Sequence, residues 1–370
     1  MGRPPQSRDG IPAASGGRPI VAGVAPFRRS LLPSNRDSEL WASLNALAIE
    51  PHGYRRLERK HGIKLDVQAG RRFSAYVVQA QQYYATIGTV DPIAKPLSGY
   101  YFALNLAKAY LTAVDPNSTT PDFVHHGLTS GFARKSRYFF QQEVVRVRDS
   151  GVFRQLAQAT GRGFCWAKGY EMRIVDLMPY LPDGYDLYAD ANDEAPKLLP
   201  VADCFALFGG KQGWIRVEVN GHELRQRNIG PESLPTRARI FGEAFRLVSS
   251  DLPTFSYESK KAFSYNKKLS EVLADLCTVF DGSLVASNRY VPGNQRYLVL
   301  SPRSSLLSHE AVTFAVLHQL STIVRYRPQD AERVRGTKHF WLFSGWIDRA
   351  CQGLLLGVAS RITREEHVAV

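Results

Sequence analysis

Apolar residues recur at helical spacing in the first and the last parts of the chain. Leu40, Leu44 and Leu47 follow one another at intervals of four and three residues, just after a Ser-Glu pair at Ser38 that suits the start of a helix. Apolar residues recur with the same spacing in longer segments, and Gly or Pro residues mark the ends of several of them. We therefore expect further helices over residues 73–87, 96–114, 308–325 and 340–361.

The segment 96–114 carries the strongest helix signal. Pro96 suits the first helical turn, and Asp115-Pro116 ends the segment. At about 100° per residue, one face is apolar and packs into a core, whereas the opposite stripe is polar and either lines a site or faces water. The apolar face carries Ala103, Leu106, Ala107, Tyr110, Leu111 and Val114, and the polar stripe carries Ser98, Tyr101, Asn105, Lys108 and Thr112.

The middle of the chain has a different pattern, because β-branched and aromatic residues cluster there in short runs. Such runs predict strands over residues 201–208, 214–219 and 297–300. Asn220-Gly221 follows the second run and predicts a type I′ hairpin turn. Gly209-Gly210-Lys211 precedes that run but lacks the spacing of a phosphate-binding loop, and we interpret it as a turn.

These patterns divide the chain into four parts. Residues 1–36 are rich in Gly, Pro, Ser and Arg, which predicts a disordered or extended basic arm. Residues 37–162 and 303–370 are predicted to be helical, and residues 163–302 to contain strands. The predicted fold class is α+β and predominantly α-helical, with a helical bundle formed by the N- and C-terminal parts and a β-containing middle region.

The chain is strongly basic. A formal net charge of +13, from 47 Lys and Arg against 34 Asp and Glu, favours a polyanionic partner such as nucleic acid or acidic lipid. Evenly spread, solvated cations would explain the same charge. Basic and aromatic residues alternate most densely over residues 134–140 and 260–268, where the rings either stack on bases or pack in the core.

Several classes of site are excluded by missing motifs. The four cysteines lie far apart, without a CxxC or Cys/His cluster, which argues against a zinc or thioredoxin-like site and favours a reducing compartment. Walker A, HExxH and GxSxG patterns are absent, and no apolar stretch is long enough to span a membrane. We expect a cytoplasmic protein without metal, cofactor or membrane partner. An acidic cluster is interpreted as a solvated loop; it consists of Asp183, Asp186, Asp190, Asp193 and Glu194.

Three passages resemble the YaaC-like family. They are IAKPLSGYYFALNLAKA at residues 93–109, HGL at residues 126–128 and LSTIVRYRP at residues 320–328. They occur in the family's order, and the similarity extends over most of the chain from about Trp41 onward. The resemblance implies a family without a settled activity.

The first two passages also resemble, more distantly, the HEPN domains, which are helical bundles in which a Ser-x-Tyr-Tyr-like helix precedes a His-containing turn. The matching residues here are Ser98, Tyr100, Tyr101 and His126. This second resemblance implies a metal-independent ribonuclease that uses an Arg followed four to six residues later by a His at a dimer interface. It also implies a role in toxin or antiviral defence systems.

Metal-independent RNA cleavage needs a group that activates the ribose 2′-OH and a cation that stabilises the phosphorane, and His and Arg can supply both. Arg303 and His309 have a suitable spacing, although chance matches are expected among 9 His and 47 Lys and Arg. His318, Thr322 and Arg325 share one face of a predicted helix. The alternative for this second set is a core histidine beside an Arg that caps the helix.

The leading hypothesis is therefore a nucleic-acid-binding protein, with RNA favoured over DNA, that cleaves RNA without a metal ion as a homodimer. The candidate catalytic residues are Arg303, His309, His318 and Arg325. The candidate substrate-binding residues are Tyr101, Asn105, Lys108, His126, Arg134, Lys135 and Arg137. The competing hypothesis is a non-catalytic scaffold that binds a protein or nucleotide partner.

Overall fold

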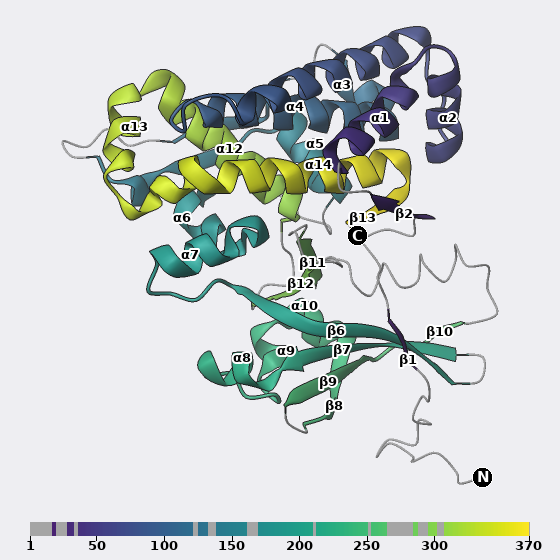
Figure 1. Cartoon of the computed structure of the whole chain (residues 1–370), viewed down its shortest axis with the longest axis vertical. Helices are drawn as coiled ribbons and strands as arrows, with labels where there is room; N and C mark the ends of the chain where they lie inside the picture. Colours follow the sequence, from purple (N-terminus) through teal and green to yellow (C-terminus); the bar gives the residue numbers. More distant parts are fainter. Residues whose placement is uncertain are drawn as a thin grey trace. The chain divides into compact units, whose positions relative to one another are not determined.

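The computed structural model describes residues 17–19, 28–32, 36–120, 125–131, 138–160, 169–209, 212–250, 253–264, 284–287, 295–301 and 307–369. The chain forms two compact units (Figure 1). The helical unit is built from two stretches of chain, residues 29–196 and 307–370, and the sheet unit comes mainly from the residues between them. The fold is α+β and mostly helical, as predicted.

The helical unit is organised around α4 (Lys95–Val114), which packs against α3 (Val67–Ile87), α12 (His309–Tyr326) and α14 (Ile347–Thr363). Helices from the N-terminal and C-terminal parts of the chain thus share one core. The other α-helices described in this unit are α1 (Arg36–Ala48), α2 (His52–His61), α5 (Val152–Thr160), α6 (Ile174–Leu177), α7 (Tyr185–Ala191) and α13 (Pro328–Arg335). Short 3₁₀ turns lie at Pro116–Thr119, Phe140–Gln142, Met178–Tyr180, Pro182–Gly184 and Lys338–Phe340, and a π-helical turn at Leu342–Trp346.

Capping side chains explain where two of these helices begin. The Asp66 side chain accepts a hydrogen bond from the Ala69 amide at 2.6 Å, and α3 consequently begins earlier than predicted. The Ser308 side chain accepts one from the Ala311 amide at 3.1 Å and begins α12, as predicted. The sequence thus encodes both helix starts, although the first was missed.

α4 is buried on more sides than its polar stripe suggests. Asn105 is 5% exposed, and its Nδ2 donates to the Tyr101 carbonyl at 2.9 Å. Thr112 is fully buried, and its hydroxyl bonds to the Lys108 carbonyl and the Thr119 hydroxyl, both at 2.8 Å. The interpretation that this stripe faces water is therefore wrong at Asn105 and Thr112, because neighbouring elements of the unit cover both sides of α4.

The helical unit also contains a small antiparallel sheet that the sequence did not predict. It consists of β3 (Leu128–Ser130), β4 (Val144–Val147) and β5 (Glu171–Arg173) in that order. Both β3 and β4 contact α12. Residues 169–196, which the sequence analysis assigned to the β-containing middle region, belong to the helical unit.

The sheet unit is built on a mixed-length antiparallel sheet with the order β11-β12-β6-β7-β9-β8. The strands are β6 (Leu198–Gly209), β7 (Gln212–Asn220), β8 (Phe245–Ser249), β9 (Thr254–Ser259), β10 (Phe263–Ser264), β11 (Leu284–Ser287) and β12 (Gln295–Val299). The helices described in this unit are α8 (Gly221–Gln226), α9 (Leu234–Arg237) and α10 (Arg239–Ala244). The unit has a hydrophobic cluster of its own.

The hairpin predicted at Asn220-Gly221 is wrong. The Asn220 side chain accepts a hydrogen bond from the His222 amide at 2.8 Å and thereby begins α8. Asn is as good a helix cap as it is a turn residue, so the local sequence alone did not distinguish the two. β6 and β7 pair with each other instead. Their pairing ends where Gly209 meets Gln212, at the turn predicted for residues 209–211. Residues 210 and 211 lie outside the described residues.

Two segments of the predicted disordered arm form strands. β1 (Gly17–Pro19) pairs with β6, and β2 (Arg28–Leu32) pairs with β13 (Glu365–Ala369). These residues are extended, because partners distant in the sequence complete the pairing; the rest of residues 1–35 lies outside the described part of the chain. Among the described helices, none has the length and hydropathy needed to cross a membrane.

Candidate functional site

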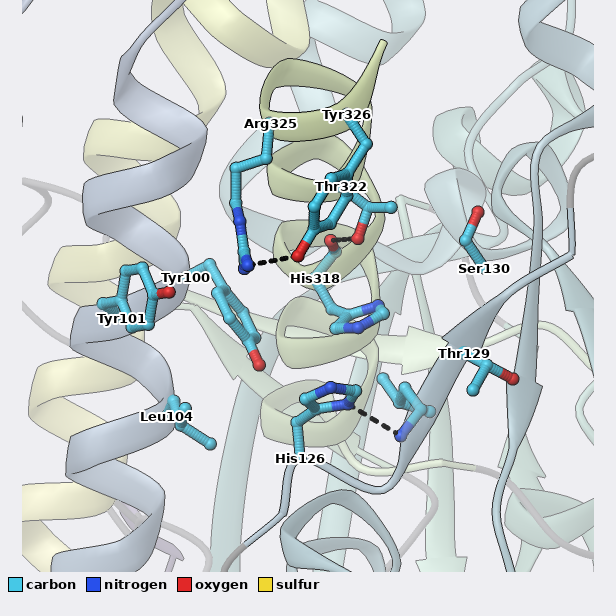
Figure 2. A pocket seen from close by; sticks show the side chains of 11 residues that line it. Tyr100, Tyr101, Leu104, His126, Thr129, Ser130, His318, Thr322, Arg325 and Tyr326 are labelled. Carbon is cyan, nitrogen blue, oxygen red and sulfur yellow. Dashed lines mark hydrogen bonds between the residues drawn. The ribbon is translucent and has the colours of Figure 1, made fainter.

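The helical unit contains a pocket of about 430 Å³ between α4, β3 and α12 (Figure 2). This volume lies within the range of small-ligand sites, about 300–1,000 Å³. α12 contributes one wall, because His318, Thr322 and Arg325 recur on one helix face. The lining consists of Tyr100, Tyr101, Leu104, His126, Leu128, Thr129, Ser130, His318, Thr322, Arg325 and Tyr326.

His318 is buried, with 5% of its surface exposed, and it lines the pocket. Its Nδ1 has no hydrogen-bond partner within the described part of the chain. Burial, the neighbouring His126 ring and the Arg325 cation lower the pKa of His318 to about 3. The imidazole is therefore uncharged at neutral pH and has an unused ring nitrogen beside the pocket.

His126 lies against His318. The centroids of the two rings are 4.9 Å apart, and their planes are inclined by 42°. His126 Nδ1 accepts a hydrogen bond from the Leu128 amide at 3.3 Å (Figure 2), so the proton of the neutral ring is on Nε2. Burial lowers the pKa of His126, and the nearby His125 and Arg148 lower it further. Both imidazoles of the pocket therefore favour the uncharged form.

The main chain around His126 is held by the loop that precedes α5. The Arg148 amide of that loop donates to the Gly127 carbonyl at 2.9 Å, and the first two amides of α5 donate to the His125 and His126 carbonyls at 2.9 and 3.1 Å. Gly127 and Gly151 have φ angles of +78° and +112°, a region that favours glycine. A Cβ on Gly151 would lie 2.6 Å from the Gly127 Cα, so no larger residue fits between the two segments. This contact between glycines places His126 at the pocket.

Arg325 lies at the exposed side of the pocket with a tyrosine ring on either side (Figure 2). Its guanidinium carbon is 5.8 Å from the centroid of the Tyr101 ring and 4.7 Å from that of Tyr326. Tyr83 stacks on Tyr101 at 5.1 Å, whereas Tyr326 is 67% exposed. Cation–π contacts of this kind orient a guanidinium and leave several of its five N–H groups available to a ligand.

The pocket favours an anion with acceptor oxygens. None of its lining residues carries a carboxylate, while Arg325, His126 Nε2 and several hydroxyl groups offer hydrogen-bond donors. Arg in particular matches the geometry of phosphate. In the described ranges, no three or more His, Cys, Asp and Glu side chains are grouped as a metal ion would require.

Four of the predicted site residues meet in this pocket. Tyr101 and His126 come from the candidate substrate-binding set, and His318 and Arg325 from the candidate catalytic set. Tyr101 lies on α4 and His126 in the turn before β3, and both are distant in the sequence from α12, which carries His318 and Arg325. The fold brings the four side chains together.

Two other candidates on α4 do not line the pocket. Asn105 is buried and bonded to the main chain of its own helix. Lys108 Nζ lies 5.3 Å from the centroid of the Tyr76 ring, and burial lowers the pKa of Lys108. Lys108 of α4 therefore contacts α3, whereas Asn105 bonds within α4.

His309 lies in the first turn of α12, away from the lining residues. Its Nε2 contacts the Asp183 carboxylate at 2.8 Å. Burial disfavours the charged imidazolium, but the Asp183 carboxylate outweighs burial and raises the pKa of His309. The interpretation of Asp183 as part of a solvated loop is wrong, because this carboxylate is 3% exposed and packs where Gly353 leaves room for it.

Four candidates lie outside the described residues, namely Arg134, Lys135, Arg137 and Arg303. Other residues that line the pocket were not selected as candidates from the sequence, among them Leu104, Thr129, Ser130 and Tyr326. Tyr326 follows Arg325 directly, and an aromatic residue beside a cation was the signal that could have identified it. Ser130 lies on a strand of three residues, for which the sequence carries no recognisable pattern.

The fold and the pocket define an α+β protein whose helical unit holds a small basic and aromatic cavity and whose chain is interrupted by a separate sheet unit. The chain belongs to the YaaC-like family, since the family model described as YaaC-like Protein matches residues 49–362. No curated protein and no solved structure matches it. The resemblance to HEPN domains gains no support from these comparisons.

Proposed function

We propose that the pocket binds a phosphate group of RNA and that the protein cleaves the RNA backbone without a metal ion. The observation that carries this proposal is the convergence of His126, His318 and Arg325 in one pocket whose lining has no carboxylate. Such cleavage needs one imidazole as a base, a second that takes up a proton and acts as an acid, and a cation. The net charge of +13 supports attraction of RNA.

The proposed step is a transesterification. One imidazole accepts the proton of a ribose 2′-OH while the 2′-oxygen bonds to the adjacent phosphorus and the bond from phosphorus to the 5′-oxygen breaks. The leaving 5′-oxygen takes a proton from the other imidazole, which takes up that proton from solvent when the phosphate binds. Arg325 stabilises the charge that develops on the phosphorane. The products are a 2′,3′-cyclic phosphate and a 5′-OH end.

The test is incubation of the purified protein, in EDTA, with labelled single-stranded RNA, total tRNA and duplex DNA, with binding and cleavage read in the same samples. We expect cleavage of RNA and not of DNA, which lacks the 2′-OH. His318→Ala and Arg325→Ala should each lower the cleavage rate by about 10²- to 10⁴-fold. End-group analysis should find the cyclic phosphate.

Matched controls are available on the surface of the sheet unit. His222 and Arg239 are exposed and belong to short helices outside the pocket. His222→Ala and Arg239→Ala should leave cleavage unchanged. Equal losses in the control and pocket variants would contradict the assignment of the reaction to this pocket, and absence of RNA binding by the unaltered protein would overturn the whole proposal.

A specific observation favours binding without cleavage as the second candidate. With its pKa lowered to about 3, free His318 is a weak base. RNA that binds in a salt-dependent manner and stays intact would support this non-catalytic function. A homodimer and a defence role rest on the HEPN resemblance alone.

A further inference from the structure

One wall of the pocket is hydrogen-bonded to polar groups buried behind it. Ser130 lines the pocket at the end of β3, and its Oγ accepts a hydrogen bond from Gln319 Nε2 at 2.9 Å. The same amide nitrogen donates to the Glu143 carboxylate. Gln319 and Glu143 are fully buried. Gln319 follows His318 on α12, so this network begins beside the candidate site.

The Glu143 carboxylate decides which way the Gln319 amide faces. Arg327 donates to both Glu143 oxygens at 2.8 Å and holds the carboxylate in place. A carboxylate whose two oxygens both accept from Arg327 acts as an acceptor, so it meets the NH₂ end of Gln319. The two hydrogens of this NH₂ group then reach Glu143 and Ser130. Ser130 Oγ is consequently an acceptor within the network.

A serine that accepts from Gln319 still has a proton to donate. Within the described part of the chain, Gln319 is the hydrogen-bond partner of Ser130, and nothing there accepts the serine proton. We propose that Gln319 is a positioning residue that turns the Ser130 hydroxyl proton into the pocket, where it donates to a phosphate oxygen of the bound RNA. This inference rests on the proposed function, and it adds Ser130 to the phosphate-binding groups.

A purely structural role for Gln319 gives a different expectation. If Gln319 acts only through Glu143, by tying α12 to the residue before β4, its loss weakens binding independently of Ser130. If it acts through Ser130, the two losses are not additive. A double-mutant cycle therefore separates the two roles.

The experiment measures binding of 2′-O-methyl UpU, which has one phosphate and cannot be cleaved, and of its uncharged methylphosphonate analogue. Ser130→Ala should weaken binding of the charged dinucleotide roughly 10- to 100-fold, as expected for a hydrogen bond to a charged group. Gln319→Met, which conserves volume, should cause a similar loss, and the double variant no greater one. Binding of the methylphosphonate should change little in all three.

Three further variants keep the test independent of folding. Thr313 also lies on α12, and its buried hydroxyl has no hydrogen-bond partner among the described residues. Thr313→Val should therefore leave binding unchanged. Should Gln319→Met not fold, Ser130→Thr retains a hydroxyl and Ser130→Val does not. Binding retained by the first and lost by the second supports the inference.

The outcomes separate this inference from the proposed function. If the unaltered protein binds neither dinucleotide nor longer RNA, the proposed function fails and the inference with it. If it binds, and Ser130→Ala has no effect or the losses in the double variant add, the inference alone is overturned. Equal losses for the charged and uncharged dinucleotides would likewise reduce Gln319 to a structural residue.

Discussion

The two histidines of the pocket are uncharged in the free protein, and an anionic ligand would favour their protonation. Burial and nearby positive groups lower the pKa of both rings, and His318 reaches about 3. A bound phosphate supplies the negative charge that the lining lacks, so it raises both pKa values. The complex then holds more protons than the free protein.

We predict that affinity for RNA rises as the pH falls from about 8 to about 5, the range in which histidine charge changes. The sign follows because protonation favours the complex over the free protein. Anisotropy titrations of labelled RNA at constant ionic strength measure it. His318→Gln should flatten the pH dependence, and an equally steep slope in that variant would assign it to other groups.

His309 should respond to pH in the opposite sense to a histidine buried without a counterion. Its pKa is raised in the folded protein by Asp183, so its stabilising contribution is complete below pH 6.5 and is lost as the pH rises through the raised pKa. We predict that His309→Gln lowers the free energy of unfolding by about 3–5 kcal/mol below pH 6.5. The loss should shrink at alkaline pH in urea titrations. The exposed His222 provides the control, since His222→Gln should change stability little at either pH.

At the scale of elements, the pocket depends on the contact between the His126 turn and the loop before α5. We predict that Gly151→Ala destabilises the protein by about 1–3 kcal/mol and also weakens RNA binding, because the added Cβ meets Gly127. Gly62 is the matched control. It too has a positive φ, of +66°, but a Cβ there meets nothing within 4 Å. Gly62→Ala should therefore cost stability and leave RNA binding unchanged.

Helices with regularly spaced apolar residues were predictable from the sequence, whereas the elements that pack against each helix face were not. The spacing of His318, Thr322 and Arg325 fixed their common face, which the structure confirms. On α4 the same reasoning placed Tyr101 and Asn105 on one stripe, yet Tyr101 lines the pocket and Asn105 is buried. A helical period defines faces, but only tertiary packing decides what covers each face.

The candidate site was predictable only in pieces. His126 and Arg325 were identified separately, as a turn residue and a helix residue, and nothing in the sequence indicated that the two would meet. β3 is too short to show an alternating pattern, so the third wall of the pocket was missed. Asp183 was misassigned because its Pro and Gly neighbours suggest an exposed turn, whereas its partner His309 lies far along the chain.

At the scale of the whole molecule, the two units have separate hydrophobic clusters. Phe241 is buried in the sheet unit, stacked on Phe245 at 4.5 Å. Phe314 is buried in the helical unit, with its ring 5.9 Å from that of Tyr100 beside the pocket. Damage to one cluster should therefore leave the other largely intact.

We predict that Phe241→Ala and Phe314→Ala each destabilise their own unit by about 3–5 kcal/mol. Hydrogen exchange measured peptide by peptide should show faster exchange in the sheet unit for the first variant and in the helical unit for the second. RNA binding should survive Phe241→Ala and fail in Phe314→Ala. Uniformly faster exchange in both variants would mean that the two units unfold together.

The pairing of β2 with β13 has a consequence for the order in which the chain folds during synthesis. Every described strand of the sheet unit has left the ribosome once Val299 has emerged, so this unit can close early. The helical unit cannot, because α4 buries itself against α12 and α14, and β2 lacks its partner until β13 is made. During that interval the apolar surface of α4 is exposed, and a chaperone that covers nascent chains would find its binding site there.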